Sequence, residues 1–308
     1  LGKQRMARRT SEALAEAEGF FREALELDPA FALAHVGLAD VLRMQHEYSG
    51  VPLESALAQS EPAVARALAL DANLAEAWAS AAAIEKAKQQ LGRSESMFQR
   101  AIGLNPNFAT ARHWYSLLLL DSGRFDESLA QIELAVALDP LSSVMRDVLG
   151  SVLEAQGRFP DAMNAYRKAA TIDPLRPGSY RSMARLLAYA FGKPADAVPF
   201  AQKAMELDPG NPGNAGFLVW LHFDLGNDAD ASRLLSVARQ VGPDNYFVLN
   251  MSGAINQARG DQQSAVHDAE RLLANDSRDV FGLVLLRDRD LQAGRPERSD
   301  RATRWRSR

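Results

Sequence analysis

The side chains that most often carry chemistry are sparse in this sequence of 308 residues. There is no cysteine, which excludes disulfides, thiolate nucleophiles and sulfur-based zinc sites. The five histidines are scattered, without a spacing that would place two of them on one metal ion: His35, His46, His113, His222 and His267. We therefore expect them to be surface or packing residues, and we expect no metal or cofactor site.

Longer catalytic motifs are absent as well. The sequence lacks GxxxxGK[ST] for phosphate, HExxH for zinc and GxSxG for an acyl-enzyme serine. GNPGNAG at 210–216 is rich in glycine but begins a first helix after a proline stop instead of joining a strand to a helix, so we expect a loop there and no phosphate cradle. The triplet at 275–277 fits a glycosylation sequon, a match that arises often by chance. The sequence thus predicts a protein without catalytic activity of its own.

An internal repeat is the dominant feature of the chain. Endings of the LDP type recur mostly every 34 residues, with one gap of 43 and one of 35, and their last residues are Pro29, Ala72, Pro106, Pro140, Pro174, Pro209, Pro243 and Ser277. Glycines recur in the same frame, at Gly123, Gly157, Gly192, Gly226, Gly260 and Gly294. Between these marks the apolar residues follow helical spacing. Glycine tolerates positive φ at the end of one helix and Asp-Pro stops the next, so each unit is predicted to be two helices joined by a tight turn.

Two short amphipathic helices cannot bury their apolar stripes alone, so consecutive pairs must stack. The predicted fold class is therefore all-α, an α-solenoid of stacked antiparallel helix pairs. We expect it to cover 1–298 as about eight to nine units, with an insertion near 44–56 that forms an exposed loop or a lengthened helix pair. The glycine in LGRSES (91–96) is displaced by three positions, which predicts an irregular turn. The Arg-rich residues 299–308 lose all helical spacing, and we expect a disordered or truncated tail.

The second helices resemble those of the tetratricopeptide repeat family. A small, a bulky and a second small residue recur at family spacing, as in Ala17, Phe21 and Ala24; Ser94, Phe98 and Ala101; Ser128, Ile132 and Ala135; Ala162, Tyr166 and Ala169; Ala197, Ala201 and Ala204; and Ala231, Leu235 and Ala238. The resemblance implies a right-handed superhelix whose first helices line a concave groove for a protein or peptide partner.

Carrying the family's inward positions onto this sequence gives the candidate groove residues His113, Asp147, Ser151, Glu154, Tyr189, Trp220, Phe223, Phe247, Asn250 and Gln257. The family's carboxylate clamp for chaperone tails requires Lys and Asn at positions that hold His113, Asp147, Ser182, Gly216 and Asn250 here, so the resemblance implies no clamp.

Tyr189, Trp220, Phe223 and Phe247 are predicted to form an aromatic patch, with Gly213 and Gly216 leaving room for a ligand side chain. The alternative is that Trp220 and Phe223 are buried between neighbouring helices.

Charge and hydropathy restrict the partners. The net charge is −4, and because both ends of the chain are basic, residues 11–286 carry an excess of acid. An acidic surface is a poor platform for phosphates, so we expect no nucleic-acid binding by this segment. No apolar run approaches the length of a membrane helix, so we expect no membrane insertion and a soluble bacterial segment, cytoplasmic in preference to periplasmic.

The first residues, through the YSGVPLE insertion, resemble the C-terminal repeat region of bacterial regulators. In those proteins a winged-helix or nucleotide cyclase domain and a TolB-like segment precede the repeats. That resemblance implies a sensor role in signalling or transcriptional regulation. The alternative is a substrate-recruiting arm of an enzyme, a nucleotide cyclase or a glycosyltransferase, whose catalytic domain is missing from this chain. Leu1 at the start suggests a fragment of a longer reading frame.

Overall fold

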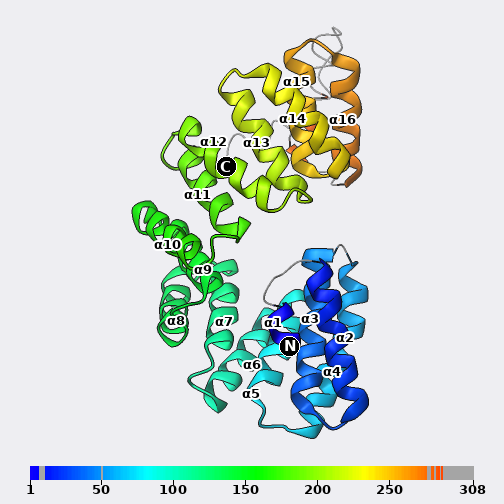
Figure 1. The fold of residues 1–308 in the computed structure, drawn as a ribbon, viewed down its shortest axis with the longest axis vertical. Helices are drawn as coiled ribbons and strands as arrows, with labels where there is room; N and C mark the ends of the chain where they lie inside the picture. Colours follow the sequence, from blue (N-terminus) through cyan, green and yellow to red (C-terminus); the bar gives the residue numbers. More distant parts are fainter. Residues whose placement is uncertain (7–10, 50, 276–278, 281, 285, 287–308) are drawn as a thin grey trace. The chain divides into compact units, whose positions relative to one another are not determined.

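The computed structural model describes residues 1–6, 11–49, 51–275, 279–280, 282–284 and 286, and within them every regular element is an α-helix (Figure 1). In chain order these are α1 (Gly2–Met6), α2 (Ser11–Leu27), α3 (Ala32–Ser49), α4 (Leu53–Leu70), α5 (Ala75–Ala87), α6 (Leu91–Leu104), α7 (Ala109–Asp121), α8 (Phe125–Leu138), α9 (Ser143–Ala155), α10 (Phe159–Ile172), α11 (Pro177–Tyr189), α12 (Pro194–Leu207), α13 (Pro212–Asp224), α14 (Asp228–Val241), α15 (Tyr246–Ala258) and α16 (Gln262–Asn275). The predictions for Gly294, for the sequon residues 276–277 and for the tail 299–308 lie outside the described residues.

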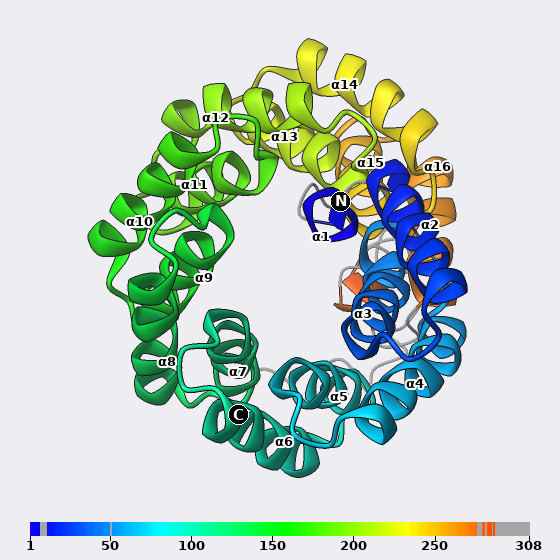
Figure 2. The same cartoon turned by 60° about the horizontal axis from the view of Figure 1, so that its bottom comes forward.

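The chain divides into two compact units, residues 1–162 and residues 163–308. In the first unit consecutive helices pack together from α1 to α9, and the first helices of successive pairs also touch, α3 with α5, α5 with α7 and α7 with α9. The second unit repeats this arrangement from α11 to α16, with α13 against α15. Figure 2 shows the resulting two layers, for example α5 and α7 in one and α4, α6 and α8 in the other. The predicted all-α stack of helix pairs is confirmed.

The predicted glycine turns join the two helices of a pair. Gly123, Gly157, Gly192, Gly226 and Gly260 all have φ between 61° and 76°. At Gly123 the turn closes through hydrogen bonds from its own N–H to the Leu120 carbonyl (3.0 Å) and from Arg124 N–H to the Leu119 carbonyl (2.9 Å). This left-handed geometry is the reason that glycine recurs there.

The turn before α6 was predicted wrongly as irregular. Gln89 has φ of 61°, and its N–H reaches the Lys86 carbonyl at 2.9 Å while Gln90 N–H reaches the Glu85 carbonyl at 2.9 Å. That is the hydrogen-bond pattern of the Gly123 turn. Gly92, by contrast, lies inside α6. The turn is therefore regular, with a glutamine in the glycine's conformation.

A side-chain donor closes the connection between successive pairs. In five first helices, the side chain of the fourth residue donates a hydrogen bond to the carbonyl oxygen of the residue six positions earlier. The donor atoms, acceptor residues and distances are His35 Nε2 to Pro29 (3.0 Å), Trp78 Nε1 to Ala72 (2.8 Å), Arg112 Nε to Pro106 (3.0 Å), Arg146 Nη2 to Pro140 (2.9 Å) and Tyr180 OH to Pro174 (3.2 Å). The residue types differ but each offers an N–H or O–H. They share a bonding role that apolar periodicity cannot reveal.

The core forms where second helices meet first helices. Phe98 and Tyr166 are fully buried, and small residues let the backbones approach. Ser94 and Ser128 use that closeness, because each hydroxyl donates to a carbonyl twelve residues earlier, at 2.8 and 2.7 Å. Each serine is therefore both a spacer and a hydrogen-bonded group.

The extra residues near 44–56 lengthen both helices of one pair. α3 and α4 each have 18 residues, whereas the first helices from α5 to α15 have 13 and the second helices from α6 to α16 have 14. The side chain of His46 holds the connection through a contact of 2.9 Å between Nδ1 and the Val51 carbonyl.

The loop predicted at 210–216 is only partly a loop. α13 begins at Pro212, and Asn211 caps it by accepting a hydrogen bond from Gly213 N–H at 3.0 Å. Proline at the first helical position and asparagine at the cap explain why two glycines do not prevent the helix.

Candidate functional site

The inward face of the second unit begins one residue earlier on α11 than the sequence indicated. The residues that precede α9, α11 and α13 are Ser142, Arg176 and Asn211. The first two of these helix starts are therefore 34 residues apart, and the last two are 35 residues apart. The extra residue lies after α11, in the turn closed by the bond from Lys193 N–H to the Leu187 carbonyl (2.9 Å). The equivalent of Asp147 is therefore Arg181, and that of Glu154 is the buried Ala188. The assignments of Ser182 and Tyr189 to these inward positions were wrong, and Tyr189 is instead the exposed last residue of α11.

This shift brings two arginines to the face, which sequence reasoning missed. Arg181 and Arg185 are exposed and lie four residues apart on α11, whereas Ser179 and Leu186 are buried. A signal was available in the sequence. The gaps from Gly157 to Gly192 and from Pro174 to Pro209 are both 35, but they do not say on which side of the first helix the extra residue falls.

Four candidate residues belong to the first unit. His113 and Asp147 are buried, at 4% and 8% exposure, while Ser151 and Glu154 are half-buried on α9. The Ser151 hydroxyl donates to the Asp147 carbonyl at 3.1 Å. Burial removes the side chains of His113 and Asp147 from the accessible surface, so they are not positioned to contact a peptide from solvent.

Tyr189, Phe217 and Trp220 form a stacked aromatic cluster in the second unit. The ring centres of Tyr189 and Trp220 are 4.8 Å apart, and those of Trp220 and Phe217 are 5.6 Å apart with their planes at 16°. Phe217 is buried, Trp220 is half-buried and Tyr189 is 60% exposed. The cluster thus runs from the core to the surface. Each alternative drawn from the sequence holds in part, because Tyr189 is exposed as in the predicted patch whereas Trp220 is partly buried between helices. Phe223 is half-buried and packs against the same core.

Phe247 lies where α15 approaches α13. A Cβ added to Gly216 would lie 2.8 Å from the Cβ of Phe247, and one added to Gly213 would lie 3.1 Å from the side-chain oxygen of Asn211. The prediction that these glycines leave room for a ligand was therefore wrong, because Phe247 fills the space at Gly216. The Phe247 ring remains 49% exposed and meets the ring of Tyr246 edge-on, with centres 5.5 Å apart.

The two predicted polar residues of α15 are half-buried. Asn250 Nδ2 lies 3.4 Å from the Tyr246 hydroxyl. Gln257 stands seven residues further along the same helix, on the same side as Asn250. Tyr246, Phe247 and Asn250 therefore make a mixed aromatic and polar edge beside α13.

Two charged side chains, Arg185 and Asp224, affect the pKa of the Tyr189 hydroxyl. Partial burial raises the pKa of that hydroxyl, the Arg185 guanidinium lowers that pKa, and the Asp224 carboxylate raises it. Asp224 is the sole Asp or Glu in the sequences of α11, α13 and α15. We define the first-helix face of the second unit as Arg181, Arg185, Tyr189, Trp220, Phe223, Phe247, Asn250 and Gln257.

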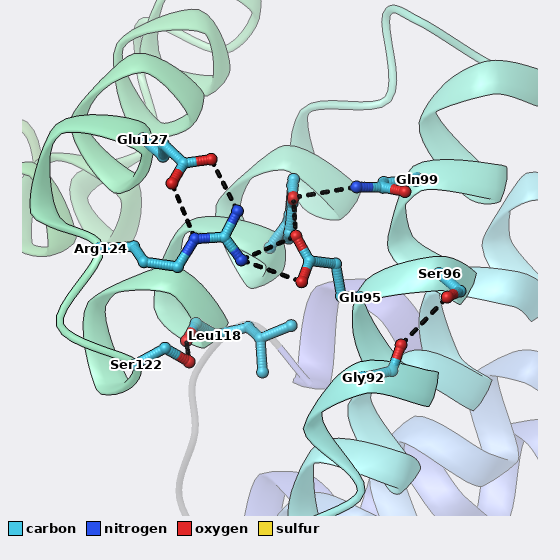
Figure 3. Close-up of polar contacts among 9 residues, drawn as sticks. Gly92, Glu95, Ser96, Gln99, Leu118, Ser122, Arg124 and Glu127 are labelled. Atoms are coloured by element: carbon cyan, nitrogen blue, oxygen red, sulfur yellow. Dashed lines mark hydrogen bonds and ion pairs between the residues drawn. The ribbon is translucent and has the colours of Figure 1, made fainter.

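A polar network in the first unit joins α6, α7 and the turn before α8 (Figure 3). Arg124 pairs through two nitrogens with Glu127, at 2.7 and 2.6 Å, and through Nη1 with both oxygens of Glu95, at 2.8 and 2.9 Å. Glu95 also accepts the Tyr115 hydroxyl at 2.7 Å, and Gln99 donates to that hydroxyl at 3.3 Å. The two carboxylates raise the pKa of Arg124, so it stays charged. Because these groups pair with one another, the network is better suited to a structural role than to catalysis.

Asp40 is a second charged group with an unusual environment. It is buried on α3, and the Ser80 hydroxyl of α5 donates to it at 2.8 Å. Burial raises its pKa to about 6 against the opposing effects of Arg43, the Ser80 hydrogen bond and Lys3. This carboxyl links neighbouring first helices and is sensitive to mildly acidic pH.

Within the described part of the chain, no three His, Cys, Asp or Glu side chains gather closely enough to hold a metal ion. Nor do the described residues include a helix of the length and hydropathy needed to cross a membrane.

Three solved structures share the fold. The chain aligns to Pseudomonas aeruginosa PilF with a TM-score of 0.59 and 16% identity, over 72% of this chain and 98% of PilF. It aligns to the Cut9–Hcn1 assembly of APC/C with a TM-score of 0.71 and 14% identity, over 89% of this chain and 52% of that one. Yeast Tom70 gives 0.64 and 16%, over 97% and 63%. These identities establish the fold alone, and this chain spans only about half to two thirds of the last two.

No curated protein sequence matches the chain significantly, and so the winged-helix and cyclase resemblance gains no support. Two models, both described as tetratricopeptide repeat, match residues 81–143 and 148–212 and residues 188–247. Together they cover more than half of the sequence, and the helix pairs, turn glycines and small-residue contacts lie at the positions these repeats require. The chain belongs to the tetratricopeptide repeat family.

Proposed function

We propose that this protein is a non-catalytic interaction module that binds a peptide segment of a partner protein on the first-helix face of its second unit. The observation that supports this site is the distribution of exposed aromatic side chains. Tyr189, Tyr246 and Phe247 on first helices of the second unit are 48% to 60% exposed. Among the described residues of α3, α5, α7 and α9, no large apolar side chain is exposed to a comparable degree.

Exposed aromatic rings at this location suit recognition. Tyr and Trp offer large, rigid contact area at low conformational cost, and such residues dominate the binding energy of many interfaces. The stack from Phe217 through Trp220 to Tyr189 holds the exposed ring in place. Partner side chains that cover Tyr189 and Phe247 would therefore gain apolar burial without having to order the exposed rings first.

Selection of short random peptides displayed on phage, with the intact protein as target, tests the proposal. We expect selected peptides to bind the wild-type protein and to bind the double variant Tyr189→Ala, Phe247→Ala at least about tenfold more weakly. Val237→Ala is the matched control, because Val237 is an exposed apolar residue on the second helix α14. Equal binding by the wild type and the double variant would refute the assignment of this face.

We also propose, from the resemblance of the first residues, that the repeats are the sensor part of a bacterial regulator. The alternative is a recruiting arm of a nucleotide cyclase or glycosyltransferase. Reading the gene upstream of the codon for Leu1 distinguishes them. A winged-helix domain in the same frame supports the regulator, a catalytic domain supports the enzyme arm, and a start codon without a further domain contradicts both.

A further inference from the structure

The first-helix face of the second unit has a charge opposite to that of most of the chain. α11 carries Arg181 and Arg185 and no acid, α15 carries no charged residue, and α13 contributes only Asp224 besides His222. The second helices of the same unit mix both signs, since α12 carries two acids and one lysine and α14 carries two acids and two arginines. The aromatic face is thus a locally basic surface on an otherwise acidic protein.

The two arginines adjoin the aromatic cluster. Arg181, Arg185 and Tyr189 succeed one another at intervals of four residues, which places them along one side of α11. Arg181 also reaches α13, because its Nη1 lies 3.4 Å from the side-chain oxygen of Asn214. The cationic and aromatic parts of the face are therefore continuous across α11 and α13.

We infer that the peptide ligand carries a carboxylate close to an apolar side chain, with the carboxylate bound by Arg181 and Arg185 and the apolar group bound by Tyr189, Trp220 and Phe247. This inference rests on the proposed function and specifies its ligand. Arginine presents a planar fork of N–H donors that matches a carboxylate, and two such residues one helical turn apart place their forks on the same side.

Asp224 limits the geometry of the ligand. Asp224 is the last residue of α13, as Tyr189 is of α11, and its carboxylate acts on the Tyr189 hydroxyl, so a ligand acid placed beside it would be repelled. The ligand carboxylate therefore lies toward Arg181, which stands eight residues before Tyr189 on α11.

The peptides selected on phage provide the test. We expect acidic residues to be enriched next to an aromatic or aliphatic residue, and we expect synthetic copies to bind Arg181→Gln, Arg185→Gln about tenfold more weakly or worse. Arg185→Lys should recover part of the affinity, and rising salt should weaken wild-type binding. The matched control is Arg233→Gln, which removes an exposed positive charge from α14. Both arginines are exposed, so circular dichroism should show these variants folded.

The outcomes separate this inference from the proposed function. Peptides that lose affinity with Tyr189→Ala, Phe247→Ala but not with the arginine variants, and that lack acids, overturn the inference while the proposed function stands. Peptides insensitive to both sets overturn both. Synthetic peptides with an amidated C-terminus distinguish a side-chain carboxylate from a terminal one, and retention of affinity identifies the side chain. Displacement of the peptide by a short single-stranded RNA, lost in the arginine variants, would show a phosphate-binding face and contradict the inference.

Discussion

Gln89 adopts the left-handed backbone conformation that Gly123 adopts 34 residues later, with φ of 61° and 73°. The hydrogen bonds that close the two turns are also the same. A residue with a Cβ is strained there by about 1 kcal/mol or more, whereas glycine is not. The fold therefore imposes this turn on a sequence that does not favour it locally.

Gln89→Gly should stabilise the protein by about 1 kcal/mol, because it relieves that strain at a turn whose other bonds stay in place. Gly123→Ala is the reciprocal variant and should destabilise it by a similar amount. Urea unfolding gives both changes as differences in the free energy of unfolding. A lower stability of Gln89→Gly would show that the glutamine side chain stabilises the turn.

Gly37→Ala should destabilise the first unit by about 1–3 kcal/mol, through overpacking. A Cβ at Gly37 would lie 2.2 Å from the ring of Phe21, and a Cβ at Gly2 would lie 2.8 Å from the same ring. Gly19→Ala is the control in the middle of α2, where a Cβ meets nothing within 4 Å and better helix propensity should stabilise by up to about 1 kcal/mol. Thermal unfolding of both variants should shift in opposite directions.

Asp40→Asn should raise stability at pH 7 by about 1–3 kcal/mol. The folded-state pKa of about 6 exceeds the ordinary value of 3.8, so the folded protein binds the extra proton. The stability that Asp40 contributes is fully present below pH 3.8 and is lost as the pH rises through about 6. Asparagine stays neutral and can still accept the Ser80 hydroxyl.

The measurement is the free energy of unfolding of the wild type and of Asp40→Asn between pH 4 and 7. The difference between the two should grow with pH and level off above about pH 6. A difference that does not change with pH would show that attraction by Arg43 and Lys3 offsets burial.

Tyr115→Phe should destabilise the first unit by about 1 kcal/mol, because the hydroxyl lies between Glu95 and Gln99. A double-mutant cycle with Glu95→Gln measures how much of this effect passes through the Glu95 contact. Purely additive effects would mean that the short contact contributes nothing to stability.

The repeat, its two helices and its turns were predictable because they follow from spacing. Glycine and Asp-Pro mark helix ends by steric rules that act locally, so Gly157 or Pro174 needs no tertiary information to be interpreted. The turn at Gln89 escaped prediction for the opposite reason. Its conformation is enforced by packing on both sides and not by its own side chain.

The candidate surface was predicted less well because one residue changes which side of a helix a position occupies. Placing the extra residue before α11 instead of after it selected Ser182 and concealed Arg181. Gly216 shows a second limit. A glycine marks a close approach, but the sequence cannot say whether a ligand or, as here, Phe247 makes it.

Hydrogen–deuterium exchange of the intact protein, with and without a peptide selected on phage, tests the central claim most directly. We expect bound peptide to slow exchange in α11, α13 and α15, with little change in α3, α5 and α7. Protection confined to the first unit, or to second helices such as α12 and α14, would contradict the assignment of the first-helix face of the second unit as the binding site.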